Sequence, residues 1–411
     1  MGLTMHERKA VTREYRSRYR RGDRKTKSAM LDEFTRLTGY ERKYAARILA
    51  DAPAKGQSSG PAGRRGRPSS IPAGFQDKLV ELWYLFDCLC GKRLVPLLRQ
   101  VVPRLVELGE CAITPDLAAA LVRVSAATVD RLLVQEKRRN QFRGTSATRP
   151  GAFLKRQIPI RTFADWNDAR PGFVEADLVV HDGGASCGDF LCTLTMTDVA
   201  TGWTEPVAQL NRAQKWTFQS IQTARSRLPF PLLGIDTDNG SEFLNCFFVE
   251  YCRDQRITFT RSRPYRKNDN CFVEQKNNSV VRRCVGYPRY ESPEALALMN
   301  RLYENYRLMV NFFLPSAKLL SKTRSGSSLH KRHDAPRSPF DRVLAHPDID
   351  QAAKTRLSAF KASLNPAQLA REVARLQDDL VMLAAPIHHI PNRWHIEYQH
   401  PHGKFSRLAS S

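Results

Sequence analysis

The stretch DTDNGSEF, residues 236–243, decides how the fold of this chain is interpreted. It follows the apolar run PLLGI, so a short buried strand is expected to end here. Asn and Gly tolerate positive φ and are typical of turns. The stretch either ends a strand at a turn or holds the Asp238 carboxylate at the strand tip, where it would bind a metal. The sequence on either side distinguishes the two.

The flanking sequence predicts the order β-β-β-α-β-α-β-α. Strands are expected at residues 173–181, 189–198, 203–210, 232–238 and 257–261, and helices at 213–227, 243–255 and 271–285. Gly-containing turns join the first three strands, which predicts antiparallel hairpins, whereas the short apolar fourth strand suits a buried parallel position. This is the order of the ribonuclease-H-like α/β fold, with a mixed five-stranded sheet.

Three acidic residues fall at informative places in this order. Asp177 lies in the middle of the first strand, Asp238 ends the fourth, and Glu274 lies in the first turn of the last helix. If the first and fourth strands are neighbours, as this fold requires, the three carboxylates converge at one edge of the sheet. They repel one another unless cations bind. Two divalent ions satisfy the arrangement, and oxygen ligands without thiolates favour Mg²⁺, with Mn²⁺ as a substitute.

The face of the last helix supports Glu274. Asn278, Val281 and Val285 follow it at helical spacing, and the two valines predict that this face packs on the sheet. A glutamate on a packing face is costly unless something neutralises it.

Other residues near these positions offer alternatives. Asp236 points to the same side of the strand as Asp238 and could replace it. Asp182 could replace Asp177, but it falls in a Gly-rich turn. Three more side chains are interpreted as structural or secondary, namely Asp198, Glu242 and His181.

These motifs carry a family resemblance. The residues that carry it are three acids, Asp177 in EADLVVH, Asp238 in DNGSEF and Glu274 in NDNCFVEQKNN, and 35 residues separate the last two. The sequence over residues 160–315 resembles the DDE transposases of bacterial insertion sequences, of the branch that shares its catalytic core with retroviral integrases. The resemblance implies that the three acids hold two metal ions and catalyse DNA cleavage and strand transfer. Pairing two DNA ends also implies a homo-oligomer, at least a dimer.

The charge balance agrees with a nucleic-acid partner. The chain has 65 Lys and Arg against 41 Asp and Glu, a net charge of +24, and such an excess favours binding to phosphates through counterion release. No apolar stretch reaches the length of a membrane span and the start lacks a hydrophobic signal core, so a cytoplasmic, nucleoid-associated protein without a membrane partner is expected. The nine cysteines, with no Cys-x-x-Cys pair, indicate reduced thiols rather than disulfides or zinc.

Composition and periodicity predict six segments. They are a helix-turn-helix domain at 1–50, a basic Pro/Gly/Ser linker at 51–72, a second helical helix-turn-helix domain at 73–136, a basic linker at 137–159, the catalytic core at 160–315, and a basic linker and tail at 316–411. This last region is expected to be helical over 349–384 and otherwise irregular.

Apolar spacing defines the helices of the two DNA-binding domains. In the first, the apolar faces are Met30, Phe34 and Leu37, then Tyr44, Ile48 and Leu49. In the second, Thr114 and Ser125 are expected to cap successive short helices.

Basic residues in four places are candidates for DNA contact. They are Arg42, Lys43 and Arg47 on the second helix, Arg64, Arg65 and Arg67 in the linker GRRGRP, Arg261, Arg263, Arg266 and Lys267 before Glu274, and Lys276, Arg282 and Arg283 after it.

Two other functions fit part of the sequence. A domesticated DNA-binding protein or repressor would keep the fold without the reaction, but all three acids are present. A ribonuclease-H-like nuclease would nick without joining, and two DNA-reading domains fit end-specific transposition better.

Overall fold

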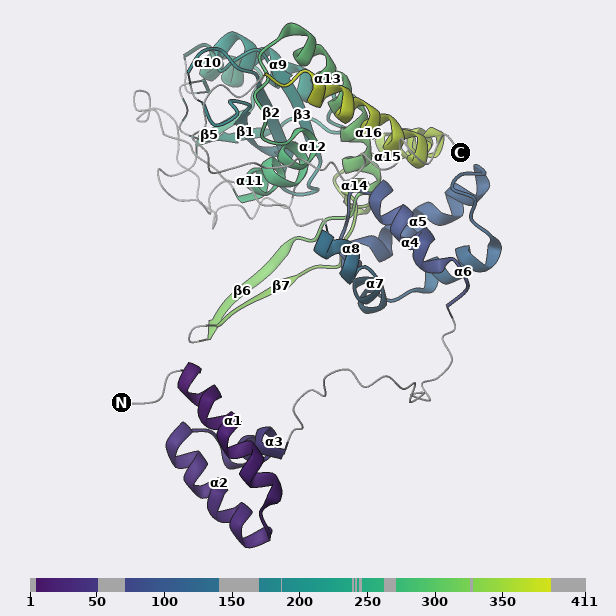
Figure 1. Cartoon of the computed structure of the whole chain (residues 1–411). Coiled ribbons are helices and arrows are strands. Elements are labelled where there is room, and N and C mark those ends of the chain that lie inside the picture. Colours follow the sequence, from purple (N-terminus) through teal and green to yellow (C-terminus); the bar gives the residue numbers. More distant parts are fainter. Residues whose placement is uncertain are drawn as a thin grey trace. The chain divides into compact units, whose positions relative to one another are not determined.

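The computed structural model describes residues 5–50, 71–139 and 170–385, apart from 186, 239, 241, 244–245, 262–270 and 326–327. The chain forms two compact units, Met1–Ser69 and Ser70–Ser411 (Figure 1). Most of the two linkers predicted at 51–72 and 137–159, and the tail from residue 386, lie outside the described residues. In the described parts, no helix has the length and apolar character needed to cross a membrane.

Unit 1 is a bundle of three helices, one more than the sequence predicts. They are α1 (Met5–Arg21), α2 (Arg24–Thr38) and α3 (Arg42–Ala50). The Asp23 side chain accepts the Thr26 N–H at the start of α2, and Gly39 ends this helix with a φ of 70°.

The core of unit 1 is small and differs in part from the predicted faces. Phe34, Ala45 and Leu49 are fully buried, whereas Leu37 and Tyr44 are 48% and 40% exposed. The prediction for the last two was wrong because α1, which the sequence did not predict, moves the core towards its own Val11, Tyr15 and Tyr19.

The second helical region of the chain begins unit 2. Its helices are α4 (Phe75–Leu85), α5 (Gly91–Glu107), α6 (Pro115–Arg123), α7 (Ala126–Leu132) and α8 (Val134–Arg139). Thr114 and Ser125 cap α6 and α7 as predicted, each accepting a backbone N–H three residues ahead.

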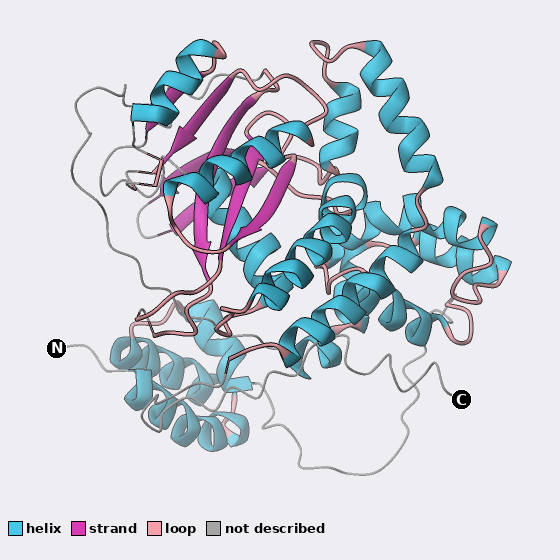
Figure 2. Ribbon diagram, turned by 90° about the horizontal axis from the view of Figure 1, so that it is seen from above, coloured by secondary structure: helices cyan, strands magenta, loops and turns pink. Residues whose placement is uncertain are grey.

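A mixed five-stranded sheet follows, in the order β3-β2-β1-β4-β5. The strands are β1 (Phe173–Val180), β2 (Cys192–Asp198), β3 (Thr204–Gln209), β4 (Gly234–Thr237) and β5 (Thr258–Arg261). β1 is antiparallel to β2 and parallel to β4, and β4 is parallel to β5. The predicted ribonuclease-H-like fold class is confirmed: in chain order α9 (Gln214–Ser226) connects β3 to β4 and α10 (Cys246–Asp254) connects β4 to β5. Figure 2 shows the strands as one layer with helices around it.

The predicted last helix of the core is interrupted by a π-helical segment. It consists of α11 (Cys271–Lys276), the π-helix η2 (Asn277–Arg282) and α12 (Arg283–Val285). A π-turn holds more residues than an α-turn, so α11 is rotated relative to α12. Val281 and Val285 are buried as predicted, but Glu274 and Asn278 are exposed, so the prediction of one common packing face was wrong.

The segment after the core contains the helices that were predicted and a hairpin that was not. The helix α13 (Pro293–Leu308) begins after its Ser292 cap, as expected, and continues into the π-helix η3 (Met309–Phe313). Residues predicted as a basic linker instead form an antiparallel hairpin of β6 (Leu319–Ser325) and β7 (Ser328–His333). Three further helices are α14 (Pro339–Ala345), α15 (Gln351–Ser363) and α16 (Pro366–Met382).

The helices α4 to α8 do not stand apart from the rest of unit 2. Their apolar side chains, for example Leu98 and Val101, belong to the same hydrophobic core as those of α13 and α16, for example Leu302 and Leu376. Polar contacts reinforce this packing, since Arg371 of α16 forms an ion pair of 2.9 Å with Glu110. The helical region and the sheet therefore fold as one body.

Candidate active site

Two of the predicted acids lie side by side because their strands are paired. Ala176 of β1 pairs with Thr237 of β4 in a parallel register, so the next residues along the two strands, Asp177 and Asp238, are neighbours. The Asp177 carboxylate accepts the Leu178 N–H at 2.8 Å and the side-chain amide of Asn277 at 2.6 Å.

The turn after β4 fixes Asp238. Its carboxylate accepts the Gly240 N–H at 2.9 Å, which is the local hydrogen bond by which Asp stabilises a turn. A Cβ atom at Gly240 would come within 2.6 Å of the Glu242 carboxylate. The stretch at residues 236–243 therefore forms a turn and also carries the half-buried carboxylate of Asp238.

Glu274 lies on the first turn of α11, whose start is held by a second carboxylate. Glu175 of β1, which is fully buried, accepts the Val273 N–H at 2.7 Å. This bond ties the helix to the strand that carries Asp177 and so limits where Glu274 can lie.

The negative charges of Asp238 and Glu274 act on Asp177. Burial, with the Asp238 charge next and Glu274 as a further contribution, raises the pKa of Asp177 to about 7. Burial also raises the pKa of Asp238, although the positive charge of Arg212 opposes this. Mutual repulsion of this kind makes a group of carboxylates receptive to cations.

The donor chemistry fits hard divalent cations. Carboxylate oxygens are the ligands that Mg²⁺ and Mn²⁺ prefer. Among the residues that the structure describes, no three His, Cys, Asp or Glu side chains converge closely enough to enclose an ion. The three acids therefore match a hard divalent cation in the type and the charge of their donor atoms.

The alternative acids have other partners. Asp198 is buried and accepts the N–H groups of Gly172 and Thr201, so it organises the turn before β3. Asp182 accepts the Gly184 N–H within its own loop. Both arrangements are structural.

Of the other three alternatives, Asp236 and Glu242 lie closer to the site. Asp236 is buried and accepts a hydrogen bond from Thr260 of β5. Glu242 is near enough to Asp238 for the Asp238 charge to add to the effect of burial and raise the pKa of Glu242. His181 is buried and shares a hydrogen bond of 2.7 Å with Thr193, away from the three acids.

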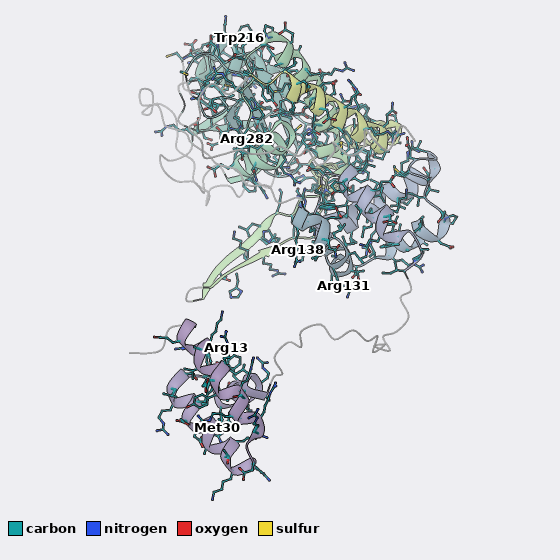
Figure 3. All side chains as sticks on the ribbon, in the orientation of Figure 1. Arg13, Met30, Arg131, Arg138, Trp216 and Arg282 are labelled. Carbon is teal, nitrogen blue, oxygen red and sulfur yellow. The ribbon has the colours of Figure 1, made fainter. Side chains whose placement is uncertain are left out.

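The predicted DNA contacts after Glu274 are largely engaged within the protein. Lys276 is only 9% exposed. Arg282, labelled in Figure 3, donates to the Val180 carbonyl at 2.8 Å, and Arg283 forms an ion pair of 3.3 Å with Asp87. Before Glu274, Arg261 is 5% exposed at the end of β5. Arg282 and Arg283 are therefore held by contacts within the protein, and Lys276 and Arg261 are buried.

The remaining predicted contacts divide between unit 1 and undescribed segments. Arg42 bonds to Asp32 and to Ser28, while Lys43 and Arg47 are exposed on α3. Outside the described residues lie Arg64, Arg65, Arg67, Arg263, Arg266 and Lys267.

Three functional candidates were missed by sequence reasoning. Asn277 contacts Asp177 directly, the positive charge of Arg212 is near enough to act on Asp238, and Glu175 holds the start of α11. The polar run EQKNN offered a signal for Asn277, which lies three residues after Glu274. Arg212 and Glu175 had none, because their roles depend on how loops and strands meet in space.

Comparisons with known proteins yield one relative in sequence and a set of distant structures. No family model matches the chain. The uncharacterized protein y4rM of Sinorhizobium fredii is 43% identical over 342 residues, which cover 83% of this chain and 96% of the relative.

Among solved structures, the HTLV-2 integrase catalytic core domain in complex with magnesium is 18% identical, with a TM-score of 0.27 over 36% of this chain and 90% of that one. The BIV integrase catalytic core domain is 14% identical, with a TM-score of 0.27 over 41% of this chain and 91% of that one. The simian T-cell lymphotropic virus intasome in complex with PP2A regulatory subunit B56 gamma has a chain that is 15% identical, with a TM-score of 0.29 over 53% and 83%.

Proposed function

The chain belongs to the same family as the uncharacterized protein y4rM of Sinorhizobium fredii, and we propose that it is a metal-dependent polynucleotidyl transferase acting on DNA. The observation that carries this proposal is the electrostatic coupling of three carboxylates from two paired strands and the adjacent helix, namely Asp177, Asp238 and Glu274. In this proposal the three are the metal ligands and the catalytic acids.

The roles of the side chains follow from their contacts. Asp177 and Asp238 present adjacent oxygens at the edge of the sheet, and Glu274 adds a third donor from α11. Asn277 orients the Asp177 carboxylate by its hydrogen bond. Two Mg²⁺ ions, when bound, would supply activation of the attacking hydroxyl group and stabilisation of the leaving 3′-oxygen.

The finer proposal is a transposase that cleaves the ends of a mobile element and joins them to target DNA. The net charge of +24 supports a polyanionic substrate. The capped helices α6 and α7 are a second candidate for recognising the DNA sequence, in addition to the helices of unit 1. Joining two ends requires two sites, so the active species in this proposal is at least a dimer, working on nucleoid DNA in the cytoplasm.

The test is a cleavage and strand-transfer assay with Mg²⁺ on a duplex that carries the sequences flanking the gene, with a supercoiled plasmid as target. We expect nicked and joined products from the wild type, and neither from Asp238→Asn or Glu274→Gln. Asp254→Asn, which removes an acid that is 69% exposed on α10, is the matched control and should keep activity.

The same assay separates the alternatives. Nicks without joined products would replace the transposase by a nuclease. Tight DNA binding by the wild type without any Mg²⁺-dependent product would favour a repressor. Loss of DNA binding in the two variants would show that they are misfolded or that the acids serve binding, so binding is measured in parallel.

A further inference from the structure

The hairpin of β6 and β7 is a ribbon that leaves the body of unit 2. Figure 1 shows the two strands extending away from the helices and the sheet. Near its base, Leu319 and Leu320 are 43% and 59% exposed. An isolated two-stranded hairpin gains little stability from its own contacts, so an exposed ribbon of this length suggests a use outside the fold.

The charge of the ribbon has one sign. Residues 318–333, KLLSKTRSGSSLHKRH, contain five Lys and Arg and no acid. Lys331 and Arg332 on β7 are exposed. A strand that carries exposed basic residues and no acid can contact a polyanion that lies along it.

The root of the ribbon is held firmly. The Lys318 ammonium donates to the backbone carbonyls of Val199 and Ala200 in the turn between β2 and β3. Asp334 accepts the Lys318 N–H at 2.6 Å and pairs with Arg342 of α14 at 2.7 Å. A fixed root gives the projecting strands a defined direction.

The root also lies near the helix that carries Glu274. Lys318 is close enough to Lys276 of α11 for their charges to interact, and Lys276 lies two residues after Glu274. Lys276 is buried and Glu274 is exposed, so the root of the ribbon and Glu274 are linked through one short helix.

We propose that the β6–β7 hairpin is an arm that binds the phosphate backbone of the duplex engaged at the candidate active site. A two-stranded ribbon has the dimensions to enter the major groove, and the absence of acids from its sequence suits contact with the flanking phosphates. This inference rests on the proposed function in one respect, that the substrate is double-stranded DNA.

The test compares duplex binding by the full-length chain across a series of salt concentrations. The arm variant is Lys331→Gln/Arg332→Gln. A charge-keeping variant, Lys331→Arg/Arg332→Lys, checks that charge rather than shape is responsible. The control, Arg253→Gln/Arg356→Gln, removes two exposed charges from α10 and α15 and so matches the change in net charge.

The expected result is a change in the salt dependence. Each lost phosphate contact lowers the slope of log K against log salt by about 0.9, so the arm variant should be shallower by about 1.8. The charge-keeping variant and the control should match the wild type. The three acids are intact in all variants, and the charge-keeping variant and the control should also keep Mg²⁺-dependent cleavage.

Two outcomes would overturn the arm proposal while leaving the proposed function intact. One is an arm variant whose salt slope and sedimentation mass both equal those of the control. The other is an arm variant whose salt slope equals that of the control while its sedimentation mass changes, which would assign the ribbon to contact with a second copy of the chain. Failure of the wild type to bind any duplex would instead overturn the proposed function, and the arm proposal with it.

Discussion

The buried His181, which directly follows β1, shows how one residue makes the stability of the fold depend on solution pH. Burial, helped by the positive charge of Arg282, lowers the pKa of His181 to about 3. Its Nε2 shares a hydrogen bond with Thr193, which also bonds to the Tyr303 hydroxyl at 2.9 Å. The folded state therefore keeps this imidazole neutral.

We predict that His181 makes unit 2 less stable as the pH falls below about 6.5. In the unfolded chain a histidine is protonated near pH 6.5, whereas in the folded chain His181 is protonated only near pH 3. Protonation thus favours the unfolded state, by about 1.4 kcal/mol between pH 7.5 and 5.5. Urea unfolding at the two pH values measures it.

The variant His181→Gln provides the comparison, because glutamine keeps hydrogen-bonding groups but does not titrate. Its free energy of unfolding should change by about 1.4 kcal/mol less than that of the wild type between the two pH values. An equal change in both proteins would show that His181 titrates normally in the folded state.

At the scale of elements, the ion pair between Asp87 and Arg283 joins the turn after α4 to α12. Arg283 also donates to the Asp87 backbone carbonyl at 2.8 Å, and Asp87 has a positive φ of 61°. The nearby Asp87 charge is the main cause of the raised pKa of Arg283. The pair therefore helps to seat the helical region against the core.

We predict that Arg283→Met costs about 2 kcal/mol of unfolding free energy, because it leaves the Asp87 carboxylate buried without its partner. Arg283 is about one-third exposed, so the cost should be smaller than for a fully buried pair. The double variant Asp87→Asn/Arg283→Met should recover part of the loss. Urea unfolding of the four proteins in the cycle measures the coupling.

The same cycle distinguishes this structural role from a DNA contact. Under the structural interpretation, Arg283→Met lowers stability while the affinity of the folded protein for duplex is retained. Weaker duplex binding at unchanged stability would restore Arg283 to the phosphate contacts that the sequence predicted.

The sheet could be predicted because each strand is a short β-branched or apolar run between turn residues. The position of the helix that carries Glu274 was predicted correctly. The side of this helix that packs on the sheet was not, because the π-turns at 277–282 depend on packing rather than on local propensity. The β6–β7 hairpin was missed because SKTRSGSSLHKRH lacks the alternation of a half-buried strand. Its strands pair only with each other, so no core selects their side chains.

The same contrast holds for the candidate site. Asp177, Asp238 and Glu274 could be proposed from strand order and spacing, which are properties of the chain. Arg212 and Glu175 act through partners about 26 and 98 residues away in sequence, and no local pattern marks such contacts.

For the molecule as a whole, we predict that the two units unfold in separate transitions. Phe34 is fully buried in the small core of unit 1, and replacing a buried Phe by Ala costs about 3–5 kcal/mol. Phe34→Ala should therefore abolish the calorimetric transition of unit 1 and leave that of unit 2 unchanged.

Leu302→Ala supplies the reciprocal control, since Leu302 is fully buried in the shared core of unit 2. It should lower only the transition of unit 2. A single cooperative transition that both substitutions shift would contradict the division of the chain into two independently stable units.

The core that α4–α8 share with α13 and α16 has a geometric consequence for any DNA that unit 2 handles. Because α6 and α7 are built on the same body as Asp177, folding sets the interval between the bases that these helices would read and the bond that the acids would cut. Unit 2 would then cut at a fixed number of base pairs from the bases that it recognises. Inserting one base pair into that interval turns the bond by about 35° around the DNA axis and takes it out of register with the carboxylates.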